Sequence, residues 1–320
     1  MMSSAATGQD NISIFHQHWW LEAASDGSID WQGIDSGSRG HILVPICSRR
    51  KIYGRANVPP PYTRLFQPRW QGKLTGGPSE EPDAVNIAHL LRRSESMFSG
   101  FDHVQFVFAG DSPLCAALAL NGFSVHEHYT FRSAAIPVSD ELWSAMHPKT
   151  RNVLRQCIRT QSVEATDDVE GYIAMARAER GVLDSHDYDA LRRIWCSVRQ
   201  KNQGTVLTVL SRASQALAKC ILVWDDRCLY YLLSTRCMSP EYQNANSLLV
   251  WKAIEISQEK GLSFDFDGYS TYDSFRFQAR FGLKVFARKT VQRSSLLWRS
   301  MKTTKRALEN AVIRREWATS

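Results

Sequence analysis

The sequence lacks the features that mark a membrane span, a secretory leader or a metal framework. No window in its 320 residues approaches the roughly 20 apolar residues that cross a bilayer. The amino-terminal stretch is polar, with neither a basic leader nor an apolar core of signal-peptide length. The seven cysteines are scattered, with no Cys-x-x-Cys pair and no His at zinc-ligand spacing. These absences predict a cytoplasmic protein with reduced thiols and no metal.

Motifs for several kinds of catalysis are absent as well. Gly76-Gly77-Pro78 leads into acidic residues instead of Gly-Lys-Ser/Thr, so it is not a phosphate-binding P-loop. No Gly-x-Ser-x-Gly elbow and no Cys–His pair marks covalent catalysis. Direct attack by an amine on a thioester requires no enzyme nucleophile, so that class of reaction agrees with the sequence.

The sequence does contain a basic segment near its carboxyl-terminal end. The net charge of +7 arises from 39 Lys and Arg against 32 Asp and Glu, and residues 288–320 carry the whole excess. The neutral remainder predicts no DNA partner, since DNA binding needs a basic surface. Residues 296–316 are predicted as a helix with an apolar stripe of Leu297, Met301, Leu308 and Val312. That stripe either docks on the protein itself or, in the sharper alternative, binds an anionic membrane surface from the cytoplasmic side.

The order of predicted elements is clearest after residue 160. Apolar spacing and turn residues predict strands at 162–166, 205–212, 215–224, 228–235, 262–267 and 284–292, and helices at 169–177, 188–200, 247–260 and 273–281. A shortened copy of this order precedes residue 136, with helices at 14–24, 82–99 and 113–121 and strands at 29–34, 41–47, 103–109 and 123–135. The repeat predicts an α/β fold with mixed sheets, divided into lobes at 1–136 and 137–295 and a basic helix at 296–320.

Four segments resemble motifs of a known superfamily. They are Phe15-His16-Gln17-His18-Trp19-Trp20-Leu21, Lys149 to Arg155, Phe264-Asp265-Phe266-Asp267-Gly268, and Phe277-Gln278-Ala279-Arg280-Phe281-Gly282. The element order after residue 160 resembles the GNAT superfamily of acyl-CoA-dependent N-acyltransferases. The doubling of this element order resembles the tandem, Fem-type aminoacyl transferases. The amino-acid sequences of the four motifs are similar to those of Fem-like or CelD-like bacterial acetyltransferases (BioF-like domains) linked to exopolysaccharide and cell-envelope synthesis.

The resemblance implies two tandem GNAT-like domains and an acyl group carried by acetyl-CoA or another acyl-CoA. A helix amino terminus offers unpaired N–H groups to a pyrophosphate, and Asn244, Ala245, Asn246 and Ser247 lead into the helix predicted at 247–260. The alternative is that Asn246 or Ser247 only caps this helix. The neighbouring strand would run beside the pantetheine arm, where a backbone N–H such as that of Leu232 would polarise the thioester carbonyl.

Two carboxylates near the end of a buried strand are the predicted catalytic groups. Strand alternation places Asp265 and Asp267 on one face, where mutual repulsion would raise one pKa and favour a general base. The alternative is pairing of one carboxylate with Arg276 or Arg280. A Tyr near the sulfur commonly protonates the departing thiolate in GNAT enzymes; Tyr269 and Tyr272 are positioned for this role, and Tyr269 is the leading candidate.

The Pro/Gly-rich stretch at 57–80 is too long for a plain turn and carries aromatic residues. Tyr62, Gln67 and Trp70 are predicted to bind the acceptor, while Arg64 and Arg69 suit anionic groups and Arg280 supplies positive charge. The leading hypothesis is acyl transfer to an amine of a sugar, peptide or small metabolite. The alternatives are a Fem-like transferase with tRNA as its aminoacyl donor, and a non-catalytic tandem GNAT scaffold.

Overall fold

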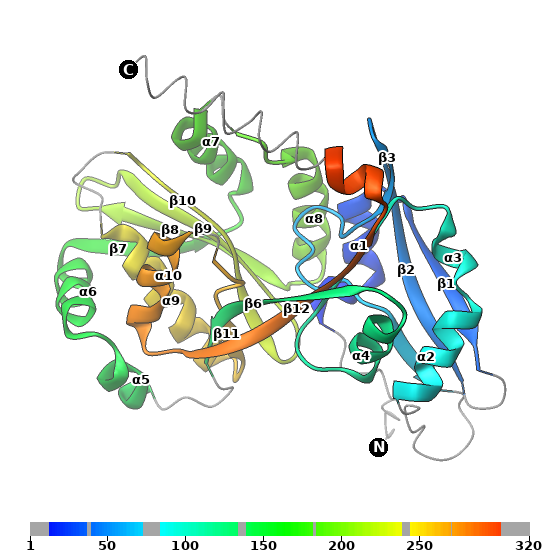
Figure 1. The fold of residues 1–320 in the computed structure, drawn as a ribbon. Helices are drawn as coiled ribbons and strands as arrows, with labels where there is room; N and C mark the ends of the chain where they lie inside the picture. Colours follow the sequence, from blue (N-terminus) through cyan, green and yellow to red (C-terminus); the bar gives the residue numbers. More distant parts are fainter. Residues whose placement is uncertain are drawn as a thin grey trace, which may run out of the picture. The chain divides into compact units, whose positions relative to one another are not determined.

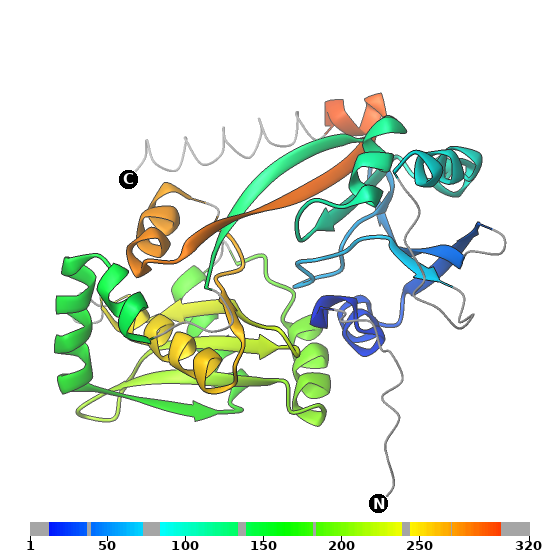
Figure 2. The same cartoon turned by 90° about the horizontal axis from the view of Figure 1, so that it is seen from below.

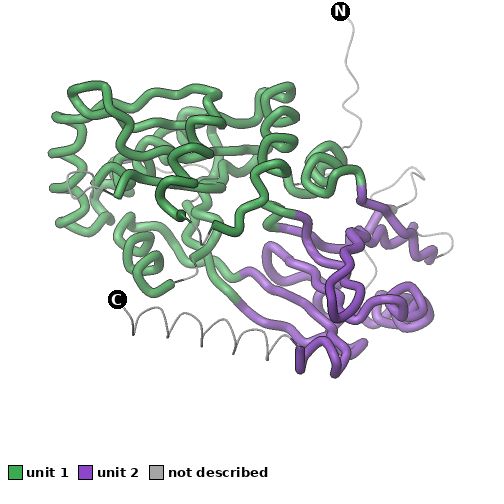
Figure 3. The backbone as a smooth tube through the Cα atoms, turned by 90° about the horizontal axis from the view of Figure 1, so that it is seen from above, with its two compact units in different colours: residues 1–27, 61–64, 128–287 green, residues 28–60, 65–127, 288–320 purple. Residues whose placement is uncertain are grey.

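The computed structural model describes residues 13–36, 40–72, 84–133, 139–181, 184–238, 244–269 and 271–301. Contacts divide the chain into two compact units, each assembled from separate stretches of sequence (Figure 3). Unit 1 comprises residues 1–27, 61–64 and 128–287, and unit 2 comprises residues 28–60, 65–127 and 288–320. The predicted division at residues 136 and 295 follows element order along the chain and stays a prediction.

The strands of unit 1 lie in the order β6-β11-β10-β9-β8-β7. Only β10 and β11 run parallel, so the sheet is mixed as predicted. Asp225-Asp226-Arg227 forms the hairpin turn between β9 and β10, closed by the hydrogen bond from the Asp225 N–H to the Cys228 carbonyl (3.1 Å). The bounds are β6 Ser124–Arg132, β7 Gln161–Thr166, β8 Gly204–Ser211, β9 Ala216–Trp224, β10 Cys228–Arg236 and β11 Ser263–Asp265.

Helices cover both faces of this sheet. On β9, Cys220 and Leu222 join the core cluster that includes Leu249 and Ile254 of α9, while Lys219, which points the opposite way, meets the start of α7. The helices, which can be followed in Figures 1 and 2, are α1 His18–Ser25, α5 Ser139–Ala145, α6 Pro148–Thr160, α7 Val169–Arg180, α8 Tyr188–Gln200, α9 Ala245–Glu259 and α10 Tyr272–Gln278. A short 3₁₀ helix precedes α1 and another follows α10.

Unit 2 contains the strand order β1-β2-β3-β5-β12, and β4 pairs separately with β2. An aromatic core of Phe98, Phe106 and Phe123 fixes its helices. The bounds are β1 Ile29–Asp35, β2 Gly40–Lys51, β3 Gly54–Asn57, β4 Arg69–Gly72, β5 His103–Phe108, β12 Lys284–Ser294, α2 Ala84–Arg93, α3 Ser96–Ser99 and α4 Pro113–Leu120. The helix predicted at 82–99 is interrupted where Glu95 N–H bonds back to the Arg92 carbonyl, a three-residue turn that ends the α-helical pattern.

Residues 296–301 form the described part of the predicted basic helix. Trp298 is buried and stacks on His103 (5.0 Å between ring centroids), whereas Leu297 and Met301 are exposed. Leu308 and Val312, the other members of the predicted stripe, lie outside the described residues. Among the described helices, none combines the length and apolar character that a bilayer crossing requires.

Candidate active site

Strands β10 and β11 separate after a short parallel pairing, and a β-bulge lies just beyond that point. The pairing ends at Tyr230 opposite Asp265, although β10 continues to Arg236. On its other side, β10 shifts register against β9 between Tyr231 and Leu233, so Leu232 is the extra residue of a bulge. Bulges redirect backbone groups and are common beside active sites. Leu232 is the strand residue that the sequence predicts to face the donor.

Arg64 joins the bulge of β10 to the turn after β11. Its Nη2 donates a hydrogen bond to the Leu232 carbonyl (3.2 Å), and its Nε lies 2.5 Å from Oδ2 of Asp267. The Asp267 side chain is 2% exposed, so Arg64 supplies a counter-charge that a buried carboxylate needs. The alternative that Asp267 pairs with an arginine is therefore correct, but the arginine is neither Arg276 nor Arg280. Sequence reasoning treated Arg64 only as a cation for anionic ligands.

The turn that carries Asp267 is fixed by the other predicted carboxylate. Asp265 is buried, and its Oδ1 accepts hydrogen bonds from the Thr130 hydroxyl (2.6 Å) and from the Asp267 N–H (2.7 Å). Thr130 in turn accepts from the Gly268 N–H (3.0 Å), and Gln278 donates to the Gly268 carbonyl (2.8 Å). Asp265 thus orients the backbone that presents Asp267.

The predicted strand at 262–267 is too long, which changes how the two acids are related. β11 ends at Asp265, and Asp267 has a left-handed backbone with φ of +67°. Asp tolerates this conformation better than most side chains, and Gly268 follows with φ of +99°. Strand alternation therefore does not reach Asp267, and the two carboxylates have different partners. Tyr269, partly exposed, packs its ring against Phe131 and Phe275.

The amino terminus of α9 has the character of an anion site. The helix begins at Ala245, two residues before the predicted start, with Asn244 as its N-cap. Asn244 makes no side-chain hydrogen bond to the first turn, and no acidic residue occurs there. The alternative in which Asn246 or Ser247 caps the helix is thus wrong. The first-turn N–H groups and the helix dipole favour a phosphate at this end.

The predicted acceptor residues divide between the units. Tyr62 and Arg280 belong to unit 1, and Gln67 and Trp70 to unit 2. Tyr62 has a left-handed backbone, and its hydroxyl donates to the Asp187 carbonyl (3.0 Å). Burial, reinforced by Asp187, raises the pKa of the Tyr62 phenol, so it keeps its proton. Trp70 lies opposite Ile42 in the pairing of β4 with β2, and the Arg280 carbonyl accepts from the His147 N–H.

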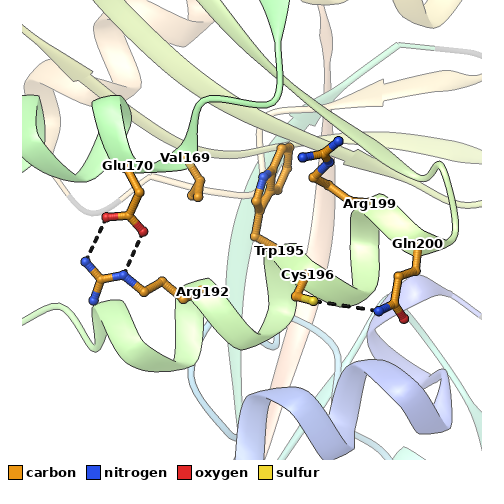
Figure 4. Close-up of a pocket in the computed structure, with 7 residues that line it drawn as sticks. All are labelled: Val169, Glu170, Arg192, Trp195, Cys196, Arg199 and Gln200. Carbon is orange, nitrogen blue, oxygen red and sulfur yellow. Dashed lines mark hydrogen bonds and ion pairs between the residues drawn. The ribbon is translucent and has the colours of Figure 1, made fainter.

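An open hollow of about 570 Å³ lies between the start of α7 and the outer side of α8 (Figure 4). Its charged groups are already paired: Arg192 makes two hydrogen bonds to Glu170 (2.7 and 2.9 Å), and Arg199 meets Asp167. None of the predicted site residues lines it; the lining is Val169, Glu170, Arg192, Trp195, Cys196, Arg199 and Gln200. The hollow therefore offers no convergent polar groups for chemistry.

Within the described residues, no group of three or more His, Cys, Asp or Glu side chains could hold a metal ion. The bulge at Leu232, the α9 terminus and the Arg64–Asp267 pair are the features that the site brings together in unit 1. A strand opening beside a helix amino terminus suits a donor that carries both a carbonyl and phosphates.

The architecture defines the class of fold: the chain shares the fold of FemX, as its resemblance to the Fem-type proteins predicts. Among solved structures, it is similar to FemX at a TM-score of 0.62 and 11% identity, over 87% of this chain and 92% of FemX. It is also similar to the carboxyl-terminal domain of a putative lysylphosphatidylglycerol synthetase from Agrobacterium fabrum (TM-score 0.56, 12% identity, 89% and 96% covered). The structure of L-PGS from Bacillus licheniformis is similar at a TM-score of 0.55 and 11% identity, over 89% of this chain and 90% of that chain. No family model and no curated protein matches the sequence.

Proposed function

We propose that this protein is an N-acyltransferase that moves an acyl group, most simply acetyl, from acyl-CoA to an amine. The observation that carries the proposal is the bulge at Leu232, which lies where β10 leaves β11 on the strand that precedes α9. A strand opening of this kind gives a thioester room beside backbone groups of β10 that β11 does not pair. The helix that follows begins without a side-chain cap or an acidic residue, which suits a pyrophosphate.

The proposed roles follow from these positions. Residues 244–247 receive the pyrophosphate, and the Leu232 N–H polarises the thioester carbonyl as charge develops on its oxygen. Asp267 contacts the acceptor ammonium, with Arg64 beside it and Asp265 holding the turn. Tyr269 is the proposed proton donor to the departing thiolate. The acceptor is an amine of a sugar, a peptide or a small metabolite, and Tyr62 and Arg280 of unit 1 are its proposed contacts, while the acceptor roles of Gln67 and Trp70 in unit 2 stay predictions.

Calorimetry and thiol release together test this proposal. Purified protein is titrated with acetyl-CoA, and free thiol is then followed with hexosamines, lysine and polyamines as acceptors. We expect binding, amine-dependent thiol release, and loss of that release in Asp267→Asn. Binding without any amine-dependent release would favour the scaffold hypothesis, whereas absence of binding contradicts the acyl-CoA donor.

Aminoacyl transfer from tRNA is the second candidate function. The fold matches above a TM-score of 0.5 include FemX, L-PGS and the carboxyl-terminal domain of a putative lysylphosphatidylglycerol synthetase, the last named for an aminoacylated lipid. A titration with charged tRNA at two salt concentrations separates this candidate from the first, because binding to a polyanion weakens steeply with salt.

A peripheral membrane role is proposed for the carboxyl-terminal segment. Leu296, Leu297 and Met301 are exposed next to Arg299, and residues 288–320 are strongly basic. Apolar side chains beside basic ones favour an anionic bilayer surface. Removal of residues 302–320 should weaken binding to phosphatidylglycerol vesicles and spare acyl transfer. An unchanged vesicle affinity would contradict this role.

A further inference from the structure

Asp184, His186 and Tyr188, which lie where the chain enters α8, form a cluster that the proposed roles leave unused. Asp184 and His186 lie 2.9 Å apart through Oδ1 and Nδ1, and Oδ1 also accepts the His186 N–H (3.1 Å). The other oxygen of Asp184 accepts from the Tyr188 hydroxyl at 2.6 Å. The carboxylate therefore has a charge-assisted partner on each oxygen, which fixes its orientation.

The imidazole of His186 lies against two tyrosine rings. Its ring stacks on Tyr62 (6.4 Å between centroids, 27° between planes) and on Tyr188 (6.0 Å, 21°). The two stacking contacts fix the plane of the imidazole, and the contact with Asp184 places Nδ1 at the carboxylate. Nε2 is left at the opposite edge of a side chain that is 30% exposed. A histidine held this way by a carboxylate has the arrangement that makes imidazole an effective proton acceptor.

The charges around the cluster keep Asp184 ionised. Burial acts to raise its pKa, but hydrogen bonds from Tyr188 and His186 outweigh burial and lower the pKa below its ordinary value. The groups that face the imidazole or its immediate partners are Asp184, Asp187, Tyr62, Tyr172, Tyr188, Arg180 and Arg177. Burial and the neighbouring Asp184 raise the pKa of the Tyr188 phenol, so it stays a donor.

Two links connect this cluster to the bulge on β10. Tyr62 stands two residues before Arg64, which contacts both Leu232 and Asp267, so the Cα atoms of Tyr62 and Arg64 lie within about 7 Å. Arg180 reaches from the Tyr188 hydroxyl (3.5 Å) to the carbonyl of Ser234, two residues beyond the bulge. The cluster therefore borders the same end of β10.

Asp267 is poorly suited to accept the proton itself. A guanidinium 2.5 Å from a carboxylate favours its charged form and so reduces its basicity. An acceptor amine still has to lose a proton to form an amide. The group that takes this proton has to be a base that is not already neutralised by an arginine.

We propose that Asp184 and His186 form the proton-accepting pair of the acyl-transfer site, a proposal that rests on the proposed function. Nε2 of His186 takes the proton that the amine loses as its nitrogen bonds to the thioester carbon. The acceptor ammonium gives its first proton to solvent before the attack, which leaves a lone pair on nitrogen. The C–S bond then breaks with its electron pair on sulfur, Tyr269 protonates the thiolate, and solvent takes the proton from His186 and reprotonates Tyr269. Asp184 is a positioning residue that acts through His186.

Thiol release from acetyl-CoA in the presence of the same amine panel, measured from about pH 5.5 to about pH 9, tests the pair. We expect His186→Gln to lower kcat/KM by about 100-fold or more and to remove the acidic limb of the pH profile. Asp184→Asn should shift that limb, Asp184→Glu should restore it in part, and added imidazole should raise the rate of His186→Gly. His18→Gln is the matched control, because His18 also meets a carboxylate (Glu22, 3.2 Å) but on the exposed face of α1.

A second measurement does not depend on turnover. Long-range ¹H–¹⁵N correlation spectra of the wild type should show the neutral imidazole of His186 as the tautomer with its proton on Nδ1 and none on Nε2. A proton on Nε2 would overturn the proposal. Wild-type turnover with an unchanged rate and pH profile in His186→Gln would overturn it alone, whereas no thiol release by the wild type would overturn the proposed function and this inference together.

Discussion

The guanidinium of Arg64 and the carboxylate of Asp267, 203 positions apart in the sequence, lie 2.5 Å from each other. Through its contact with Leu232, the same guanidinium also touches β10, so one side chain spans the point where β10 and β11 separate. The energetics of this pair, of the α9 terminus, of one glycine and of one helix cap can each be measured.

Arg64→Met should lower the free energy of unfolding by about 1–3 kcal/mol. The free energy falls because Asp267 would keep its buried charge without a neighbouring cation. Since Arg64 is 37% exposed, the expected loss is smaller than for a fully buried ion pair. Urea denaturation measures it. Arg199→Met is the control, since Arg199 and its partner Asp167 are both more than half exposed and should contribute about 0.5 kcal/mol or less. Equal losses in the two variants would contradict a special role for the Arg64–Asp267 pair.

Asn244→Asp should stabilise the protein and weaken donor binding at once. A carboxylate at the N-cap of α9 interacts favourably with the helix dipole, by about 0.5 kcal/mol, but repels a pyrophosphate at the same place. Urea denaturation and calorimetry with acetyl-CoA follow the two effects. Thr271→Asp makes the same charge change at the N-cap of α10 and should leave acetyl-CoA affinity unchanged. An unaltered affinity in Asn244→Asp would remove the α9 terminus from the proposed donor site.

Gly282→Ala should be more destabilising than Gly261→Ala, although both glycines have positive φ. A Cβ at Gly261 meets no atom within 4 Å, so only backbone strain of about 1–2 kcal/mol arises. At Gly282 a Cβ would lie 2.9 Å from the backbone carbon of Ala145, and a clash adds to the strain. Thermal unfolding of both variants decides the order. Similar losses would mean that α5 moves aside easily, and Gly282 would then matter only for its backbone.

The pairing of Asp168 with Lys219 should make stability depend on acid pH. A hydrogen bond from Lys219 is the main cause that lowers the pKa of Asp168 below its ordinary 3.8. Because the folded pKa is the lower one, this contribution is present above about pH 4 and disappears as the pH falls through the lowered value. Asp168→Asn keeps the cap on the Gly171 N–H but leaves Lys219, itself buried, without its anion.

At pH 7 we expect Asp168→Asn to cost about 1–2 kcal/mol, a modest figure because Asp168 is half exposed. The difference from wild type should shrink below about pH 3. Urea denaturation across this range measures it, with the exposed Asp189→Asn as control. A difference that stays constant down to acid pH would show that the ion pair is not its source.

Elements with strong local signals were predictable from sequence. The helix predicted at 188–200 has those bounds in the structure, because an N-cap at Asp187 and apolar spacing define both its start and its buried face. β10 differs from its predicted span by a single residue. Short strands were missed: β3 and β4 have four residues each, and such lengths carry no usable periodicity.

The site itself was only partly predictable, since its decisive contacts are not local. Phe264-Asp265-Phe266-Asp267 alternates like a strand, yet a hydrogen bond from Thr130 and a left-handed residue end the strand at Asp265. No periodic pattern in the sequence predicts the bulge at Leu232 or the hydrogen bond that Arg64 donates to the Leu232 carbonyl. The Asp184–His186 pair left a faint signal, two acids and a histidine before a helix, which on its own is typical of capping.

The amino-terminal segment is synthesised long before the residue to which it is hydrogen-bonded in the folded protein. The Ile14 N–H is bonded to Asp225 (3.0 Å), a partner 211 positions later in the chain. A ribosome adding about 5–20 residues per second would need about 10–40 s to make that partner. Until then Ile14 and Phe15, both fully buried in the finished protein, stay exposed on the nascent chain. The yield of native protein should therefore depend on how fast a chaperone binds these residues and on how fast the codons before residue 225 are decoded. Both dependences should be weaker in a protein whose amino-terminal segment contacts residues nearby in the sequence.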